Sequence, residues 1–117
     1  MSPSVLTTEG TGGACVARIS GDLDMAAADG LVNAIVRAAQ DAQATAVVLD
    51  LTDCHYLDSA GVSAIFLTHE HLNSRQVLLT LVSPASSPVS RLLKIVQLEE
   101  LVAVYETIEM ALERKQT

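Results

Sequence analysis

The sequence predicts an α/β fold, in which a small mixed, mostly parallel β-sheet opens with a β-hairpin and is packed with about four helices. Three observations predict this fold. Two β-like segments flank a glycine-rich turn at the start of the chain. Two short, nearly continuous apolar runs are typical of buried central strands. Segments with helical apolar spacing alternate with these runs, as crossover connections between parallel strands require.

The glycine-rich turn defines the opening hairpin. Residues 5–9 and 14–20 have strand composition, and three of the four residues from 10 to 13 are glycine. Glycine readily adopts the positive φ angles that short hairpin turns need. Residues 21–24 are expected to be a loop after the hairpin.

The next segments predict a helix, a buried strand and a polar loop. Five apolar residues between positions 28 and 42 are spaced by three and four, which predicts one helix over residues 26–43. Residues 46–51 are apolar except for Asp50 and predict a strand buried on both faces. Residues 52–58 are expected to form the polar loop that follows.

A second helix is expected to start at Ser59. Its apolar side is predicted to consist of Val62, Ile65, Phe66, His69 and Leu72. His69 is expected to be half-buried on that side and His71 to face solvent. The two histidines are only two positions apart and therefore do not share a side of the helix on which they could bind a metal.

The last third of the chain predicts strand, helix, strand, helix. Residues 77–82 form a second buried run. Ser87 and Pro88 are typical of an N-cap followed by proline at the first helical position. A final strand is expected over residues 102–105, followed by a helix capped by Thr107.

Length and composition indicate one domain, residues 1–117. Half of the residues are apolar, with one Phe, two Tyr and no Trp, so the core is expected to be aliphatic. The net charge is −7 and the seven Lys and Arg residues are scattered, which argues against nucleic acid and favours a basic protein partner. The chain shows neither a membrane-length apolar run nor a secretory signal, and Cys15 and Cys54 are isolated, so we expect a cytoplasmic protein.

Residues 50–62 lead from a buried strand through a polar loop into a helix. Asp58 stands at the expected N-cap position, where its carboxylate accepts from backbone N–H groups of the first turn. Ser59 is then the first helical residue, near the positive end of the helix dipole, a position that suits a phosphate. Gly61 fits a place where another backbone approaches closely.

A phosphate on Ser59 would add about −1.5 to −2 charges beside Asp58 and near Asp22 and Asp24. A partner surface matched to a neutral hydroxyl would then meet an uncompensated anion. The same residues equally fit a helix cap with no switch, because Asp and Ser commonly cap helices. The chemistry of the residues leaves both interpretations open.

Three motifs resemble the STAS domain of anti-sigma factor antagonists. Leu57-Asp58-Ser59-Ala60-Gly61-Val62 resembles the Asp-Ser-[Ser/Ala/Thr]-Gly-[Leu/Val] segment that starts a helix in that family. Gly21-Asp22-Leu23-Asp24 resembles the family's Gly-[Glu/Asp]-hydrophobic-Asp segment after the second strand. Val82-Ser83-Pro84, followed by an amphipathic helix, resembles the family's third motif, a strand that ends near Ser-Pro before such a helix. The resemblance extends from about residue 5 to 112, the expected core of a STAS fold.

The resemblance implies a switch protein that is not an enzyme and has no catalytic residue, metal or cofactor. The unphosphorylated chain would bind an anti-sigma factor that is also a serine kinase, and so release a sigma factor for transcription. Phosphorylation of Ser59 would end this binding, and a serine phosphatase would restore it. The implied partner-binding residues are Asp22, Asp24, Asp58, Ser59, Ala60 and Gly61. Many relatives have a second serine at the position of Ala60, so Ser59 is the one acceptor in this motif.

STAS domains also serve as cytoplasmic adaptor subunits of membrane transporters and as pieces of stress-signalling scaffolds. The sequence leaves this alternative open, and it does not specify the oligomeric state. Other classes fit less well. A receiver domain would phosphorylate Asp50 or Asp53 but needs a strand-end lysine, whereas Lys94 falls in a predicted helix. A serine hydrolase would need a G-x-S-x-G segment, which the chain lacks. Asp22-Leu23-Asp24 has the D-x-D spacing of aspartate-nucleophile phosphatases without their further lysine and metal site.

Overall fold

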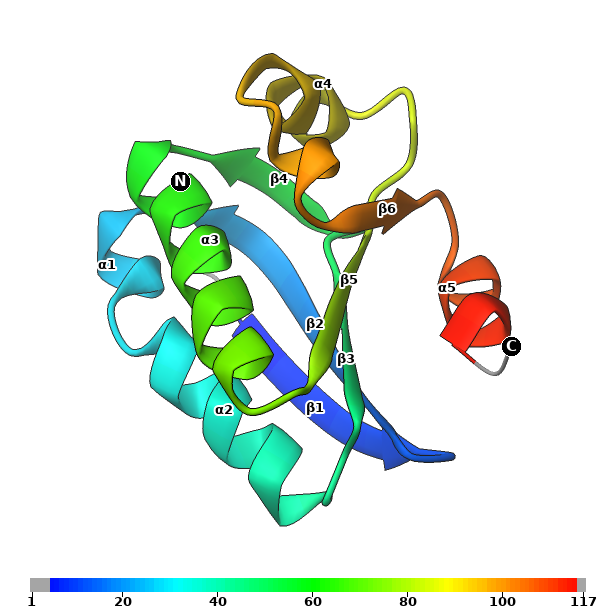
Figure 1. The fold of residues 1–117 in the computed structure, drawn as a ribbon. Helices are drawn as coiled ribbons and strands as arrows, with labels where there is room; N and C mark the ends of the chain where they lie inside the picture. The colour runs from blue at the N-terminus through cyan, green and yellow to red at the C-terminus, as the bar shows by residue number, and fades with distance from the viewer. Residues whose placement is uncertain (1–4, 116–117) are drawn as a thin grey trace.

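The computed structural model describes residues 5–115 of the chain (Figure 1). The expectation that the chain has no secretory signal rests partly on residues 1–4, which lie outside the described residues. In order, the elements are β1 (Val5–Thr11), β2 (Ala14–Leu23), α1 (Met25–Ala28), α2 (Leu31–Asp41), β3 (Ala46–Asp50), β4 (Cys54–Leu57), α3 (Ser59–Ser74), β5 (Leu78–Val82), α4 (Pro88–Ile95), the 3-10 helix η1 (Leu98–Glu100), β6 (Ala103–Tyr105) and α5 (Ile108–Lys115).

The strands form a mixed sheet in the order β1-β2-β3-β5-β6, and β4 pairs separately with the end of β2. β1 is antiparallel to β2, and the other strand pairs within residues 5–115 are parallel. Gly12 and Gly13 form the hairpin turn with φ angles of 54° and 83°, which a two-residue turn between twisted strands favours. The predicted fold class and its opening hairpin are confirmed.

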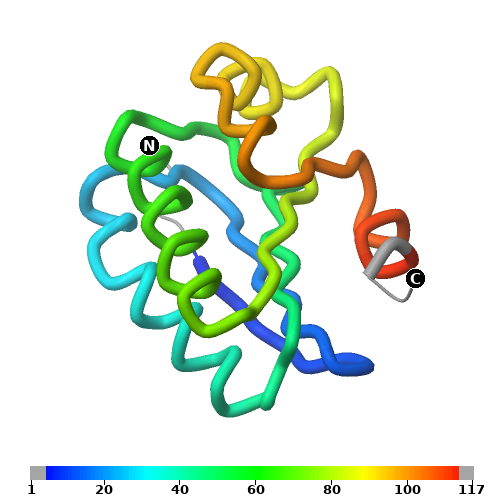
Figure 2. Tube along the Cα trace, viewed as in Figure 1, coloured from blue at the N-terminus to red at the C-terminus, as the bar shows by residue number. Residues whose placement is uncertain are grey.

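The helices cover the two faces of the sheet unequally. Figures 1 and 2 show α1, α2 and α3 over one face and α5 on the opposite face. The larger core includes Ile35, Leu49 and Ile65. A smaller cluster joins Val48 to Ala111 of α5. β3 is buried along its whole length, as predicted for a central strand covered on both faces.

The prediction of one helix over residues 26–43 is wrong, because this segment forms two helices, α1 and α2. Gly30 lies between them with a φ of 86°, a left-handed angle that interrupts right-handed helix. The apolar spacing did not reveal the break, since Ala28 and Leu31 on either side of it contact the same core. The break also explains why residues 5–115 contain five α-helices where about four were expected.

The two predicted loops, residues 21–24 and 52–58, lie largely in strands. β2 continues to Leu23 with a register shift after Gly21, and it pairs there with β4. Within the first loop, Asp24 alone is outside a strand. Both segments are short and contain or adjoin Gly and Asp residues, which strands disfavour, at Gly21, Asp22 and Asp53. Hydrogen bonds between the paired segments, such as the one from the Gly21 N–H to the Asp53 carbonyl, stabilise them as strands.

The buried side of α3 differs from the predicted one. Its buried residues are Gly61, Ala64, Ile65, Thr68 and Leu72. Phe66 is 42% exposed, contrary to the prediction, whereas His69 is half-buried and His71 exposed, as expected. The prediction followed the spacing of the large apolar residues. It misplaced the buried side of α3 because that side begins with the small residues Gly61 and Ala64.

The caps of the last two helices are confirmed. The Ser87 hydroxyl accepts from the Ser90 N–H at 3.0 Å, with Pro88 at the start of α4. The Thr107 hydroxyl accepts from the Met110 N–H at 3.2 Å at the start of α5. The 3-10 helix η1 is a feature that the sequence pattern did not predict.

Candidate functional site

Two of the segments singled out in the sequence lie side by side at one end of the sheet. β2 and β4 are parallel there, with Leu23 opposite Leu57. The Asp58 N–H donates to the Leu23 carbonyl at 3.4 Å. The strand pairing therefore brings Asp24, which follows β2, and Asp58, which follows β4, to the same edge at the starts of α1 and α3.

Asp58 caps α3 as predicted. Its backbone is extended (φ −98°, ψ −174°), and its Oδ1 accepts from the Gly61 N–H at 2.9 Å. Ser59 is the first helical residue and its side chain is exposed. The described residues provide no hydrogen-bond partner for the Ser59 hydroxyl. The cap is thus made by Asp58, and Ser59 presents a hydroxyl at the N-terminus of the helix.

Asp24 caps α1 with nearly the same geometry. Its Oδ1 accepts from the Ala27 N–H at 3.0 Å, with φ −101° and ψ −172°. Sequence reasoning placed Asp24 in a partner-contacting loop and missed this role, although an aspartate before three helix-forming residues favours a cap. Asp22 is half-buried in the last part of β2. The two caps hold the carboxylates of Asp24 and Asp58 at adjacent helix starts.

Gly61 permits the close approach of α3 to β2. A Cβ at this position would lie 2.5 Å from the Leu23 carbonyl oxygen and 2.5 Å from Leu57 Cδ1. The close backbone approach expected at Gly61 therefore exists, and it involves Leu23 of the same chain. Gly61 is buried, so its contribution to the site is to set the position of Asp58, Ser59 and Ala60 on the surface.

An open groove of about 690 Å³ runs between α1 and α3 beside these residues. Among its lining residues are Met25, Ala28, Val32, Ala60, Ser63 and Leu67. Met25 is 74% exposed and Leu67 48% exposed, so two large apolar side chains are available to a partner. Ala60 is the one predicted binding residue that lines the groove.

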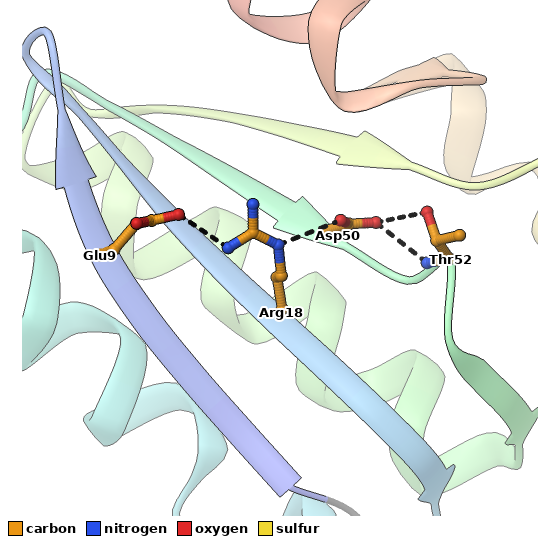
Figure 3. Close-up of polar contacts among 4 residues, drawn as sticks. All are labelled: Glu9, Arg18, Asp50 and Thr52. Atoms are coloured by element: carbon orange, nitrogen blue, oxygen red, sulfur yellow. Dashed lines mark hydrogen bonds and ion pairs between the residues drawn. The ribbon is translucent and has the colours of Figure 1, made fainter.

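Arg18 links β1 to β3 through Glu9 and Asp50, as Figure 3 shows. Its Nη1 lies 2.8 Å from Glu9 Oε1 and its Nε 3.6 Å from Asp50 Oδ2. The hydrogen bond with Glu9 is the main cause that raises the pKa of Arg18. Asp50 Oδ1 also accepts from the Thr52 N–H at 3.0 Å and the Thr52 hydroxyl at 2.6 Å. Asp50 is thereby occupied in fixing the loop after β3, which disfavours its use as a receiver-domain phosphate acceptor.

The cysteines are free and buried, and burial raises the pKa of both the Cys15 and the Cys54 thiol. A protonated, buried thiol is a poor nucleophile. Among residues 5–115, no group of three or more His, Cys, Asp and Glu side chains is placed to hold a metal. Within the same residues, every helix is too short or too polar to cross a membrane.

The fold is that of a STAS domain. The chain belongs to the STAS domain family, whose family model matches residues 5–111. An anti-sigma factor antagonist from Mycobacterium paratuberculosis has a similar structure, with a TM-score of 0.86 and 25% identity over 98% of this chain and 96% of that one.

Structures of two further proteins, which are less than 25% identical to this chain, have the same fold. The anti-sigma factor antagonist SpoIIAA, in its unphosphorylated form, has a TM-score of 0.73 and 23% identity over 96% of this chain and 98% of that one. SpoIIAA from Bacillus has also been solved in a phosphorylated form. A sulfate transporter family protein from Wolinella succinogenes has a TM-score of 0.71 and 20% identity over 89% of this chain and 85% of that one.

Proposed function

We propose that the protein is an anti-sigma factor antagonist that is switched by phosphorylation of Ser59. Its unphosphorylated form binds an anti-sigma factor that is also a serine kinase, which releases a sigma factor in the cytoplasm. The kinase phosphorylates Ser59 and the complex separates, and a serine phosphatase resets the switch. The observation that carries this proposal is the exposed Ser59 hydroxyl at the start of α3, directly after the capping Asp58 and next in sequence to Ala60, which lines the apolar groove.

A kinase can modify Ser59 without unfolding the helix start. Asp58 makes the cap, so the Ser59 hydroxyl is not required for the first turn of α3. A phosphate there lies near free backbone N–H groups and the positive end of the dipole, an interaction that contributes about 0.3–1 kcal/mol to helix stability. The phosphorylated chain therefore keeps its fold, and the switch acts on the surface.

The new charge has a much larger effect in a complex than in the free protein. Two like charges about 4 Å apart repel by about 1 kcal/mol in water but by about 4 kcal/mol at the effective dielectric constant near a protein surface. Docking removes water from around the phosphate, Asp58 and Asp24. A loss of about 3 kcal/mol lowers affinity about a hundredfold.

The partner that fits this surface has an apolar side chain flanked by basic residues. Met25 and Leu67 offer apolar contact in the groove and Asp29 also lines it, while Asp24 and Asp58 supply negative charge at the starts of α1 and α3, the two helices that flank it. Small Ala60 leaves room next to Ser59, and buried Gly61 holds this turn against Leu23. Docking in the groove places the partner against the hydroxyl that is to be phosphorylated.

Leu67→Asp is expected to weaken binding to the anti-sigma partner at least tenfold, because it places a charge in the apolar groove and removes burial that contributes about 1.5–3 kcal/mol. Phe66→Asp is the matched control, since Phe66 is the neighbouring apolar residue on α3, 42% exposed and outside the groove lining. Calorimetric titration of both variants, with circular dichroism to verify folding, measures the effect. Equal affinities for the two variants would exclude the groove as the docking surface.

The similar fold of the Wolinella sulfate transporter family protein supports a second candidate, an adaptor subunit of a membrane transporter or of a stress-signalling scaffold. A pull-down with the unmodified protein separates these roles. Capture of a kinase-like anti-sigma factor supports the proposed function. Capture of a transporter or scaffold subunit, with no affinity for an anti-sigma factor, supports the second.

A further inference from the structure

Among residues 5–115, strand β1 is an open edge of the sheet. It is the first strand in the sheet order, and its residues are exposed apart from half-buried Leu6. Proteins usually protect such edges with lysine, proline, bulges or a covering segment. The one charged residue of β1 is Glu9, and Figure 3 shows it directed at Arg18 of β2, across the same face of the sheet. The edge therefore carries few features that oppose pairing with another strand.

The hairpin register determines which residues of β1 face that edge. The two-residue turn at Gly12 and Gly13 pairs Thr11 with Ala14. In an antiparallel pair, hydrogen-bonded and non-hydrogen-bonded positions alternate along the strand from such a turn. Leu6, Thr8 and Gly10 are therefore the residues whose backbone N–H and C=O groups point toward the open edge.

We propose that a second copy of this chain pairs with β1 in antiparallel orientation about a two-fold axis at Thr8. Thr8 then lies opposite Thr8 of the copy, and Leu6 lies opposite Gly10 of the copy. The backbone N–H and C=O groups that point outward from one β1 strand therefore face those that point outward from the other. Gly10 has no side chain to oppose Leu6 of the copy, and the nearest side chain to a Cβ at Gly10 would be Ala42, at 3.5 Å, which Leu6 of the copy can contact. Partly buried Leu6 gains apolar contact with α2 of the copy.

The same arrangement brings the two α2 helices together. A groove of about 500 Å³ between β1 and α2 is lined on the helix side by Ala34, Arg37, Ala38 and Asp41. Strands are about 4.8 Å apart, so helices lying over β1 and β2 of each copy come about 10 Å apart, a normal packing distance. The small side chains of Ala34 and Ala38 permit this approach.

The charges along α2 are self-complementary, which identifies a second copy as the occupant. Gly10 lies level with Ala42. A strand rises about 3.3 Å per residue and a helix about 1.5 Å, so the axis at Thr8 passes close to Ala38. A two-fold rotation there brings Arg37 of each copy within reach of Asp41 of the other. The interface is locally neutral although each chain carries a net charge of −7.

This dimer does not depend on the proposed function. The residues that form it lie on β1 and α2, and Ser59 and the α1–α3 groove are not among them. One strand edge and one helix face form an interface at the small end of the specific range, so we expect a reversible dimer.

Sedimentation and light scattering of the full chain, from low micromolar to near-millimolar concentration, test the proposal. The mass of the unmodified chain is expected to rise from 12.3 kDa toward twice that value. Thr8→Pro removes an outward N–H, which edge strands tolerate, and is expected to remain monomeric. R37D is expected to weaken the dimer at least tenfold, and the charge-swapped R37D/D41R to restore it.

A chain that stays monomeric over the whole range would overturn the proposal. So would a dimer that persists in folded Thr8→Pro, or a charge swap that fails to restore what R37D removes. If circular dichroism shows that Thr8→Pro is misfolded, the surface variants R37D and R37D/D41R decide the outcome, since Arg37 and Asp41 are exposed.

Discussion

Ser59→Ala is expected to abolish phosphate incorporation by the cognate kinase while the fold is retained. Ser59 supplies the exposed hydroxyl at the start of α3, and Asp58 supplies the cap, so removing the hydroxyl deletes the acceptor and leaves the helix start in place. Ala60 follows directly, so the motif holds no second acceptor. Intact-mass spectrometry after incubation with kinase and ATP measures the incorporated phosphate.

Ser63→Ala is the matched control for this experiment. Ser63 is exposed on the same helix and lines the groove, so it meets the same kinase surface without lying at the helix start. It is expected to be phosphorylated like the unmodified chain. Undiminished phosphate incorporation into Ser59→Ala would show that another residue is the acceptor. An acid-labile phosphate would indicate that the acceptor is Asp50 or Asp53.

Gly61→Val is expected to lower the free energy of unfolding by about 3 kcal/mol. Its Cβ would lie 2.5 Å from both the Leu23 carbonyl oxygen and Leu57 Cδ1, a distance that requires α3 to move away from β2. A side chain at a helical glycine gains less than about 1 kcal/mol in helix propensity, so the steric cost dominates. Urea unfolding followed by circular dichroism gives this free energy.

Ser63→Ala again serves as a control on α3, at an exposed position, and is expected to change stability by less than about 0.5 kcal/mol. A Gly61→Val variant as stable as this control would show that the contact between α3 and β2 is looser than the structure has it.

The features that were predictable from sequence are those that a short segment encodes by itself. Glycines at the hairpin turn and the apolar run of β3 determine local conformation with little help from distant residues. Ser87 and Asp58 likewise act on helix turns a few residues away. Strand β4 was not predicted because it is only four residues long and lies between Asp53 and Asp58, a residue type that strands disfavour, and it becomes a strand through pairing with the end of β2. The break between α1 and α2 at Gly30 was not predicted because the apolar spacing continues across it.

The candidate site was predictable to the same extent. Asp58 and Ser59 lie in one segment, and their order alone indicates a cap followed by a free hydroxyl. The groove could not be predicted, since Met25 and Leu67 are far apart in sequence and are brought together by the packing of α1 on α3. The prediction misplaced the buried side of α3 for a related reason. Packing against β2 buries the small residue Gly61, whereas the large residue Phe66 is exposed.

The central claim is that a phosphate on Ser59 breaks a complex that the bare hydroxyl permits. Calorimetric titration of the anti-sigma partner with the unphosphorylated chain, and with the same chain quantitatively phosphorylated at Ser59, tests it most directly. We predict an affinity about a hundredfold lower for the phosphorylated form, equivalent to about 3 kcal/mol. Equal affinities for the two forms would contradict the account.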